Sequence, residues 1–191
     1  PTKFSAAMIK FSTPLCLLAA VALSMPSWAT QWTVSNSAQA PAQFMGPTAL
    51  QDAVNSASDG DTLLVTGSGA TYGNVIIDKP LVLVGMGYSP IVQATIIGEM
   101  DIRSSGVFAT GFSATQGLQL NAFNAPGQTL GNVEIRRCMG PIDLRGSSTL
   151  GAGLFSDVTV GECIITGVNF ANGFVENRFV FDTLLFTNNI F

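Results

Sequence analysis

A repeat with a period of roughly 25 residues runs through most of the chain, and such periods are typical of solenoids. It restricts the fold more than any other feature of the sequence. Five segments align, and they begin at positions 80, 106, 132, 157 and 182. In a solenoid, neighbouring repeats bury a continuous core. The first and third residues after each lead position are apolar or small and are expected to point inward: Leu81/Leu83, Val107/Ala109, Val133/Ile135, Val158/Val160 and Thr183/Leu185.

The stretches between these segments indicate which kind of solenoid to expect. Further short apolar stretches occur at 75–77, 100–102 and 142–144, with Gly and Asn between them and no helical stripe. Leucine-rich repeats would need a different leucine pattern, and helical repeats would need paired helices, neither of which follows position 60. We therefore predict a parallel β-helix with three short strands per coil, whose aligned strands stack about 4.8 Å apart in one sheet.

Positions 1–29 have the pattern of a secretory signal peptide. Lys3 and Lys10 precede a short apolar stretch, and Ala29 ends a cleavage pattern of small residues. The apolar stretch is shorter than the roughly 20 residues of a membrane-spanning helix. We predict a signal peptide over 1–29, export to the periplasm, cell surface or extracellular space, and no membrane span after the signal is removed.

A lead-in and a helix are expected before the repeat. Residues 30–47 form a polar lead-in, either a strand or a loose arm. Thr48 and Gln51 have the spacing of a capping box, so a short amphipathic helix is predicted over 48–57. Its apolar stripe is Ala49, Leu50, Ala53, Val54 and Ala57. The β-helix domain is predicted over 48–191, and we expect it to continue beyond Phe191.

Composition excludes several functions. The 191 residues include no His, only 10 % are charged, and the net charge is -4. The absence of His excludes histidine acid–base catalysis and Ser-His-Asp or Cys-His pairs within this chain. The acidic balance argues against a nucleic-acid partner.

Three strings carry a family resemblance: Gly60-Asp61-Thr62, Thr71-Tyr72 and Leu83-Val84-Gly85-Met86-Gly87. Together they resemble the opening of right-handed parallel β-helix proteins of the pectin lyase-like superfamily, in which a helix covers the apolar end of the first coil. The resemblance implies an all-β fold, a right-handed parallel β-helix with a short N-terminal capping helix. The superfamily includes lyases, hydrolases, esterases and adhesins, so it implies no single activity.

The catalytic strings of these enzymes are missing or altered. The polygalacturonase-like strings are absent, and Phe181-Asp182-Thr183-Leu184 differs from the Gln-Asp-Thr-Leu of pectin methylesterases at its first residue. Asp182 aligns with Asn132 and Asp157, so we interpret all three as turn residues at strand starts.

The resemblance to pectate lyases implies carboxylates that bind Ca²⁺ and an arginine base. The candidate residues for such a site are Arg136, Arg145, Glu134, Glu162 and Asp143. Glu134 should point outward, but its equivalents Val82, Phe108, Thr159 and Leu184 are uncharged. A solvated face with weak ion pairs is therefore favoured. Ca²⁺ is expected only if the chain is a lyase, and no other cofactor or metal is expected.

Two further pairs repeat along the chain. The spacing between Asp101-Ile102-Arg103 and Asp143-Leu144-Arg145 is not a multiple of the repeat, so we expect them on different faces. Cys138 and Cys163 are one repeat apart, which brings their Cα atoms within disulfide range. An exported protein could hold them as a disulfide or as stacked buried thiols, and the sequence leaves both open.

Two functions follow from these patterns. The favoured one is an exported, non-catalytic β-helix segment of a surface or extracellular protein, whose side wall binds polysaccharide or other cell-surface components. Phe108, expected to point outward, is a candidate contact for such a ligand. The alternative is the N-terminal part of a polysaccharide lyase or another carbohydrate-active enzyme. At least three carboxylates and an arginine together in one groove would indicate this alternative.

Overall fold

The computed structural model describes residues 29–37, 41–87, 93–122, 129–146, 154–172 and 180–191. The predicted signal peptide thus lies outside the described residues, apart from Ala29. The elements in chain order are β1 (Gln31–Ser35), β2 (Phe44–Met45), α2 (Ala49–Ser56), β3 (Thr62–Val65), β4 (Val75–Ile77), β5 (Val82–Val84), β6 (Thr95–Ile102), β7 (Phe108–Thr110), β8 (Phe112–Asn121), β9 (Thr129–Arg136), β10 (Met139–Gly146), β11 (Leu154–Gly161), β12 (Ile164–Asn172), β13 (Val180–Phe181) and β14 (Leu184–Thr187).

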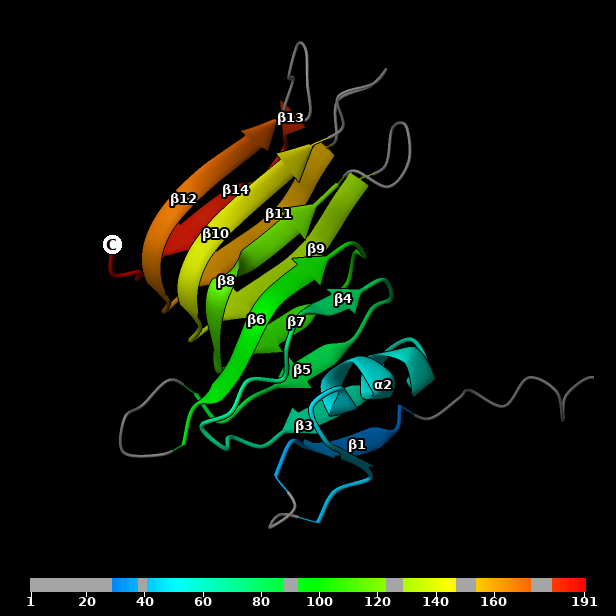
Figure 1. Cartoon of the computed structure of the whole chain (residues 1–191). Coiled ribbons are helices and arrows are strands. Elements are labelled where there is room, and N and C mark those ends of the chain that lie inside the picture. Colours follow the sequence, from blue (N-terminus) through cyan, green and yellow to red (C-terminus); the bar gives the residue numbers. More distant parts are fainter. Residues whose placement is uncertain (1–28, 38–40, 88–92, 123–128, 147–153, 173–179) are drawn as a thin grey trace, which may run out of the picture.

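The described strands form two parallel sheets. Sheet A has the order β13-β11-β9-β7-β5-β3-β1-β2, with β14 also paired to β11, and sheet B has the order β12-β10-β8-β6-β4. From β3 to β13 the chain alternates between the sheets, so each of these coils gives one strand to sheet A and one to sheet B (Figure 1). β13 and β14 both pair with β11 in sheet A. The all-β class is confirmed, and the stack is consistent with a β-helix-like solenoid.

The register of sheet A confirms the aligned repeat except in the last coil. Val133 pairs with Val158, but Val158 pairs with Leu184 and not with Thr183. A one-residue slip exchanges the two faces of a strand, so the prediction that Thr183 and Leu185 point inward is wrong. Leu184 and Phe186 pack against the core, whereas Leu185 is 49 % exposed.

The prediction of three strands per coil is also wrong. Residues 100–102 and 142–144, expected to belong to different strands of the coil, lie in one ladder of sheet B. Ile102 pairs with Leu120, which pairs with Leu144. The described coils from β3 to β12 therefore have two strands each. The strands of sheet B from β6 to β12 have 8–10 residues and pair with register shifts.

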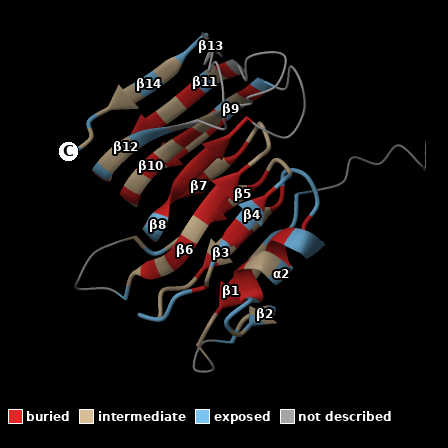
Figure 2. Cartoon of the chain, turned by 45° about the horizontal axis from the view of Figure 1, so that its top comes forward, coloured by how far each residue is buried: buried red, intermediate tan, exposed pale blue. Residues whose placement is uncertain are grey.

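The core lies between the sheets, as Figure 2 shows by the buried colour along the central strands. Alternate residues of each strand point inward, and they stack in columns from coil to coil. In sheet A, Leu83, Ala109, Ile135 and Val160 form such a column, and all are fully buried. In sheet B, Ile102, Leu120 and Leu144 do the same.

Helix α2 lies at the N-terminal end of the stack, near β1, β3 and β4 (Figure 1). Four residues of the predicted stripe, Ala49, Leu50, Ala53 and Val54, are buried in the core. The predicted capping box is wrong, because the Thr48 side chain makes no bond to the helix backbone. The Thr48 hydroxyl instead donates to Asp52 Oδ2 at 2.8 Å.

Asp61 anchors the lead-in, in which Gln31–Ser35 form strand β1 of sheet A. Its buried carboxylate accepts hydrogen bonds from Trp32 Nε1 at 2.9 Å and from the backbone N–H groups of Thr30 at 2.6 Å and Ser58 at 2.9 Å. Burial alone would raise the pKa of Asp61, but the three hydrogen bonds together lower it below its ordinary value. The start of sheet A is thereby fixed to the turn before β3.

Candidate functional site

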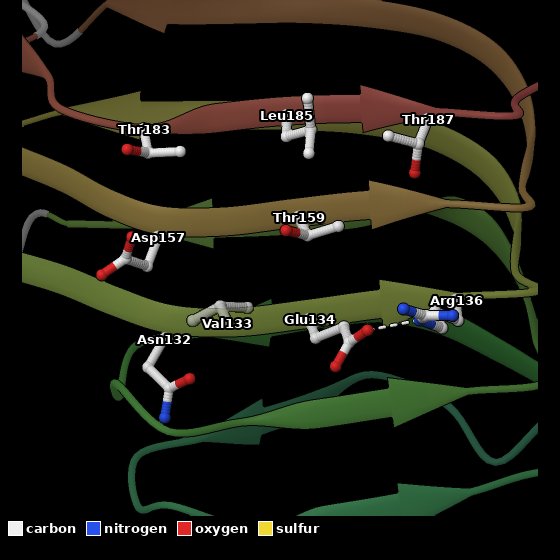
Figure 3. Close-up of a pocket in the computed structure, with 9 residues that line it drawn as sticks. All are labelled: Asn132, Val133, Glu134, Arg136, Asp157, Thr159, Thr183, Leu185 and Thr187. Carbon is white, nitrogen blue, oxygen red and sulfur yellow. Dashed lines mark hydrogen bonds and ion pairs between the residues drawn. The ribbon is translucent and has the colours of Figure 1, made fainter.

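An open hollow of about 450 Å³ lies on the outer face of sheet A, across β9, β11 and β14 (Figure 3). Threonine, carboxylate, amide and guanidinium groups line it, together with two aliphatic residues. The lining residues are Asn132, Val133, Glu134, Arg136, Asp157, Thr159, Thr183, Leu185 and Thr187.

Strand alternation places these side chains. Val133 and Ile135 are buried on the inner face, so Glu134 between them points outward, as predicted. Parallel pairing then aligns Glu134 with Thr159 and Thr159 with Leu185. This outward column continues through Phe108 to Val82 on the preceding coils. The predicted column thus holds, except that Leu185 takes the place expected for Leu184.

Gly161 opens the next outward column. It pairs with Arg136 on one side and Thr187 on the other. A Cβ atom at Gly161 would come within 2.9 Å of Thr187 Oγ1. The Thr187 hydroxyl therefore occupies space that a side chain at position 161 would need.

Ion pairs form one end of the hollow. The Arg136 guanidinium bonds Glu134 Oε1, and its Nη1 lies 3.3 Å from Glu162 Oε1. Arg137 Nε lies 3.8 Å from Glu162 Oε2. These side chains are between 36 % and 65 % exposed, and ion pairs at such exposure contribute at most about 1 kcal/mol. Their main effect is to orient Arg136 along the wall.

Asn132 and Asp157 lie at the other end, beside the strand starts. Both have a positive φ, 52° and 54°. Asn and Asp tolerate this left-handed conformation better than most residues, which agrees with their interpretation as turn residues. Figure 3 shows both side chains at the same end of the hollow as Thr183.

The five residues proposed for a lyase site do not meet in one groove. Glu134, Arg136 and Glu162 come together on sheet A, but Asp143 and Arg145 belong to β10 of sheet B. Asp143 Oδ1 accepts a hydrogen bond from Asn169 Nδ2 at 2.8 Å. Ca²⁺ needs several converging oxygen ligands. In the part of the chain that the structure describes, no three His, Cys, Asp or Glu residues are grouped to hold a metal ion.

The two Asp-x-Arg pairs lie on the same face, so the expectation of different faces is wrong. Asp101 pairs with Gln119, and Gln119 pairs with Asp143, in one column of sheet B. The first of these steps along the chain is shorter than the second, because a short connection and the three-residue β7 follow β6, whereas a longer connection and the eight-residue β9 follow β8. The spacing from Asp101 to Asp143 therefore corresponds to two coils of unequal length.

Cys138 and Cys163 are brought together at the corners that follow β9 and β11. Both are buried free thiols, and the Cys138 N–H donates to Cys163 Sγ at 3.4 Å. A disulfide between them stays a prediction.

Sequence reasoning missed three lining residues of the hollow, Thr183, Leu185 and Thr187, and it placed Thr159 in the outward column without naming it as a site residue. The outward direction of these side chains follows from the alternation of residues along each strand, once β14 is shifted by one residue. A second hollow of about 230 Å³ lies against β5 and β7, and Arg137 also lines it. Arg137 therefore borders this second hollow and also belongs to the charged corner, the ion pairs that Arg136 and Arg137 form with Glu162.

Comparisons with protein-family models, with curated proteins and with solved structures each gave no match. No helix among the described residues is long and apolar enough to cross a membrane.

Proposed function

We propose that this chain is an exported, right-handed parallel β-helix of the pectin lyase-like kind that binds a polysaccharide on the outer face of sheet A and does not cleave it. Two parallel sheets that alternate coil by coil support the fold, and the pattern of residues 1–29 supports export. The observation that carries the binding is the open hollow across three strands, lined mainly by polar side chains.

The lining chemistry suits a ligand rich in hydroxyl groups. The hydroxyls of Thr159, Thr183 and Thr187 both donate and accept hydrogen bonds, as sugar hydroxyls do. The Asn132 amide also does both, and the carboxylates accept. Leu185, which is half exposed, adds apolar surface for the C–H face of a sugar ring.

The shape suits a chain more than a compact molecule. Three adjacent strands span about 10 Å at about 4.8 Å per strand, and the volume of about 450 Å³ falls in the range of ligand sites. The hollow is open, and the outward column continues over Phe108 and Val82. A ligand chain lying across the strands could therefore follow the wall for several coils.

Charge favours an uncharged polysaccharide. Arg136 and Arg137 are matched by Glu134 and Glu162 in the ion pairs, and Asp157 adds one negative charge to the lining. The wall therefore has no excess of positive charge to attract a polyanion. An uronate chain would also bring carboxylates next to Glu134 and Asp157.

The proposal does not include catalysis. A lyase of the alternative kind would need its arginine and carboxylates in one groove, whereas the candidates here lie on two sheets. Glu134 and Arg136, the pair within the hollow, bond each other.

Binding tests the proposal directly. The purified chain is measured by affinity electrophoresis and calorimetry against neutral polysaccharides (β-glucan, galactomannan, xylan) and acidic ones (polygalacturonate, alginate). Thr159→Trp fills the hollow, and Gln116→Trp places the same side chain on an exposed site of sheet B.

We expect the wild type and Gln116→Trp to bind a neutral polysaccharide, and Thr159→Trp to bind at least tenfold more weakly. Binding to none of the polysaccharides, or unchanged binding by Thr159→Trp, would overturn the proposal. Binding to acidic polysaccharides alone would overturn the proposal that the ligand is uncharged.

A further inference from the structure

Cys138 and Cys163 occupy one column of the stack, at the corner where the chain passes from sheet A to sheet B. The pairing of Met139 with Ile164 places the two cysteines opposite each other on neighbouring coils. Cys138 is fully buried and Cys163 is 2 % exposed. Opposite residues on paired strands have Cα atoms about 5 Å apart, inside the window of about 4.4–6.8 Å that disulfides require.

A hydrogen bond joins the two cysteines at this corner. The Cys138 N–H donates to Cys163 Sγ at 3.4 Å. Cys138 Sγ also lies 3.2 Å from the Arg136 carbonyl oxygen, and Cys163 Sγ lies 3.2 Å from the Gly161 carbonyl oxygen. Each thiol therefore folds back on its own corner, with Cys163 Sγ held against the backbone of Cys138.

The pair is also unequal in acidity. A hydrogen bond from Cys138 lowers the pKa of Cys163 to about 7, against the opposing effects of burial and of the Glu162 carboxylate. The same hydrogen bond and burial raise the pKa of Cys138 well above its ordinary value. The backbone N–H of Cys138 donates to Cys163 Sγ and would stabilise a thiolate there. Because the thiolate is the nucleophile in disulfide exchange, Cys163 is the thiol expected to react first.

We propose that Cys138 and Cys163 are an oxidative modification site and form a disulfide that joins two neighbouring coils. The oxidant is a small-molecule disulfide such as oxidised glutathione. Cys163 thiolate attacks one of its sulfurs, which breaks the S–S bond and releases one glutathione thiolate. Cys138, once deprotonated, attacks the mixed disulfide at the sulfur of Cys163 and releases the second glutathione. The protein loses two hydrogens, and the two glutathione molecules gain them.

The disulfide would act on the charged corner of the candidate site. Arg137 immediately precedes Cys138, and Glu162 immediately precedes Cys163. Both residues have a positive φ, 48° and 57°, and their side chains form an ion pair at 3.8 Å. A covalent link would therefore fix the two corners that present Arg137 and Glu162. This inference does not depend on the proposed function.

The experiment uses the full chain with Cys16→Ser, so that only the pair remains. After incubation with oxidised glutathione at pH 8, we expect the intact mass to fall by two hydrogens and a Cys138–Cys163 cross-linked peptide to appear. The melting temperature should rise by roughly 6–12 °C relative to the reduced protein, because the link closes a long loop.

Two single variants test the order of reaction. Cys138→Ser keeps a hydroxyl beside Cys163, and it should form a mixed disulfide with glutathione at least tenfold faster than Cys163→Ser. Equal rates would overturn the assignment of Cys163 as the first nucleophile. A wild-type pair that stays fully reduced, while both cysteines are alkylated after unfolding, would overturn the disulfide itself.

Discussion

The outer faces of the two sheets use polar residues in opposite ways. On sheet A, Glu134 and Arg136 are partly exposed and line an open hollow. On sheet B, Asp101 is buried and accepts hydrogen bonds from Arg103 at 2.7 Å and Asn121 at 3.2 Å. Polar side chains bond one another on both sheets, but the group around Asp101 is buried, whereas the ion pairs beside the hollow are partly exposed.

The difference shows what an outward position in a stacked sheet can do. Strand alternation gives both sheets an outward face, but it does not decide whether that face is covered. Where outward polar groups are buried, each lost partner costs stability. Where they are exposed, the same groups add little stability and are available to a ligand. The following predictions test this contrast.

The largest effect should come from the inner face of sheet A, next to the hollow. Ile135 is fully buried, so Ile135→Ala should lower the free energy of unfolding by about 2–5 kcal/mol. Glu134→Gln, one residue away on the outer face, should lower it by less than about 1 kcal/mol. Urea unfolding of both variants measures this, and equal losses would show that the face assignment is wrong.

A smaller loss is expected on the outer face of sheet B. Asp101→Asn removes the charge that binds Arg103 and weakens the bond from Asn121. Because Asp101 is 5 % exposed, we expect a loss of about 1–3 kcal/mol. Urea unfolding of Asp101→Asn and Glu134→Gln under the same conditions compares the two losses. If Asp101→Asn costs no more than Glu134→Gln, the two outer faces do not differ as described.

Replacing Gln119 should leave the free energy of unfolding unchanged or raise it slightly. Its Oε1 atom is buried and has no hydrogen-bond partner among the described residues. Gln119→Met keeps the length of the side chain and removes the unpaired group, so stability should stay equal or rise by up to about 1 kcal/mol. Thermal unfolding followed by circular dichroism checks this. A loss above about 1 kcal/mol would show that Gln119 makes a needed bond.

The smallest effect on stability is expected within the hollow. Thr159→Val preserves shape and removes one hydroxyl, and the change in unfolding free energy should stay within about 0.5 kcal/mol. Binding to a neutral polysaccharide should weaken severalfold, because the hydroxyl contributes a hydrogen bond. Thr115→Val, at an exposed position of sheet B, is the control. Calorimetry on both variants distinguishes a site on sheet A from a general effect of removing a hydroxyl. Equal weakening in both variants would contradict a site on sheet A.

The sequence predicted sheet A better than sheet B for a physical reason. In sheet A the strands from β5 to β11 recur at a nearly constant interval, so Leu83, Ala109 and Ile135 align by simple spacing. In sheet B the steps between paired strands are unequal, because the short β7 lies between β6 and β8, the longer β9 lies between β8 and β10, and β8 carries extra residues at its register shifts. Spacing alone could not align Asp101 with Asp143.

The site was predictable only in part. The outward direction of Glu134 follows from its buried neighbours, and this was predicted. The slip of one residue at β14 hid Thr183 and Leu185, because Asp182, Thr183 and Leu184 fit the repeat almost equally well at either register. The separation of Glu134 from Asp143 needed the sheet assignment of each strand, which no local pattern contains.

The central claim is that sheet A presents the binding face and sheet B does not. The most direct measurement is an NMR titration of the isotope-labelled chain with the neutral oligosaccharide of highest affinity. The account predicts amide shift changes at Glu134, Thr159 and Leu185, with Gln119 and Asp143 unchanged. Changes confined to Gln119 and Asp143, or spread equally over both sheets, would contradict it.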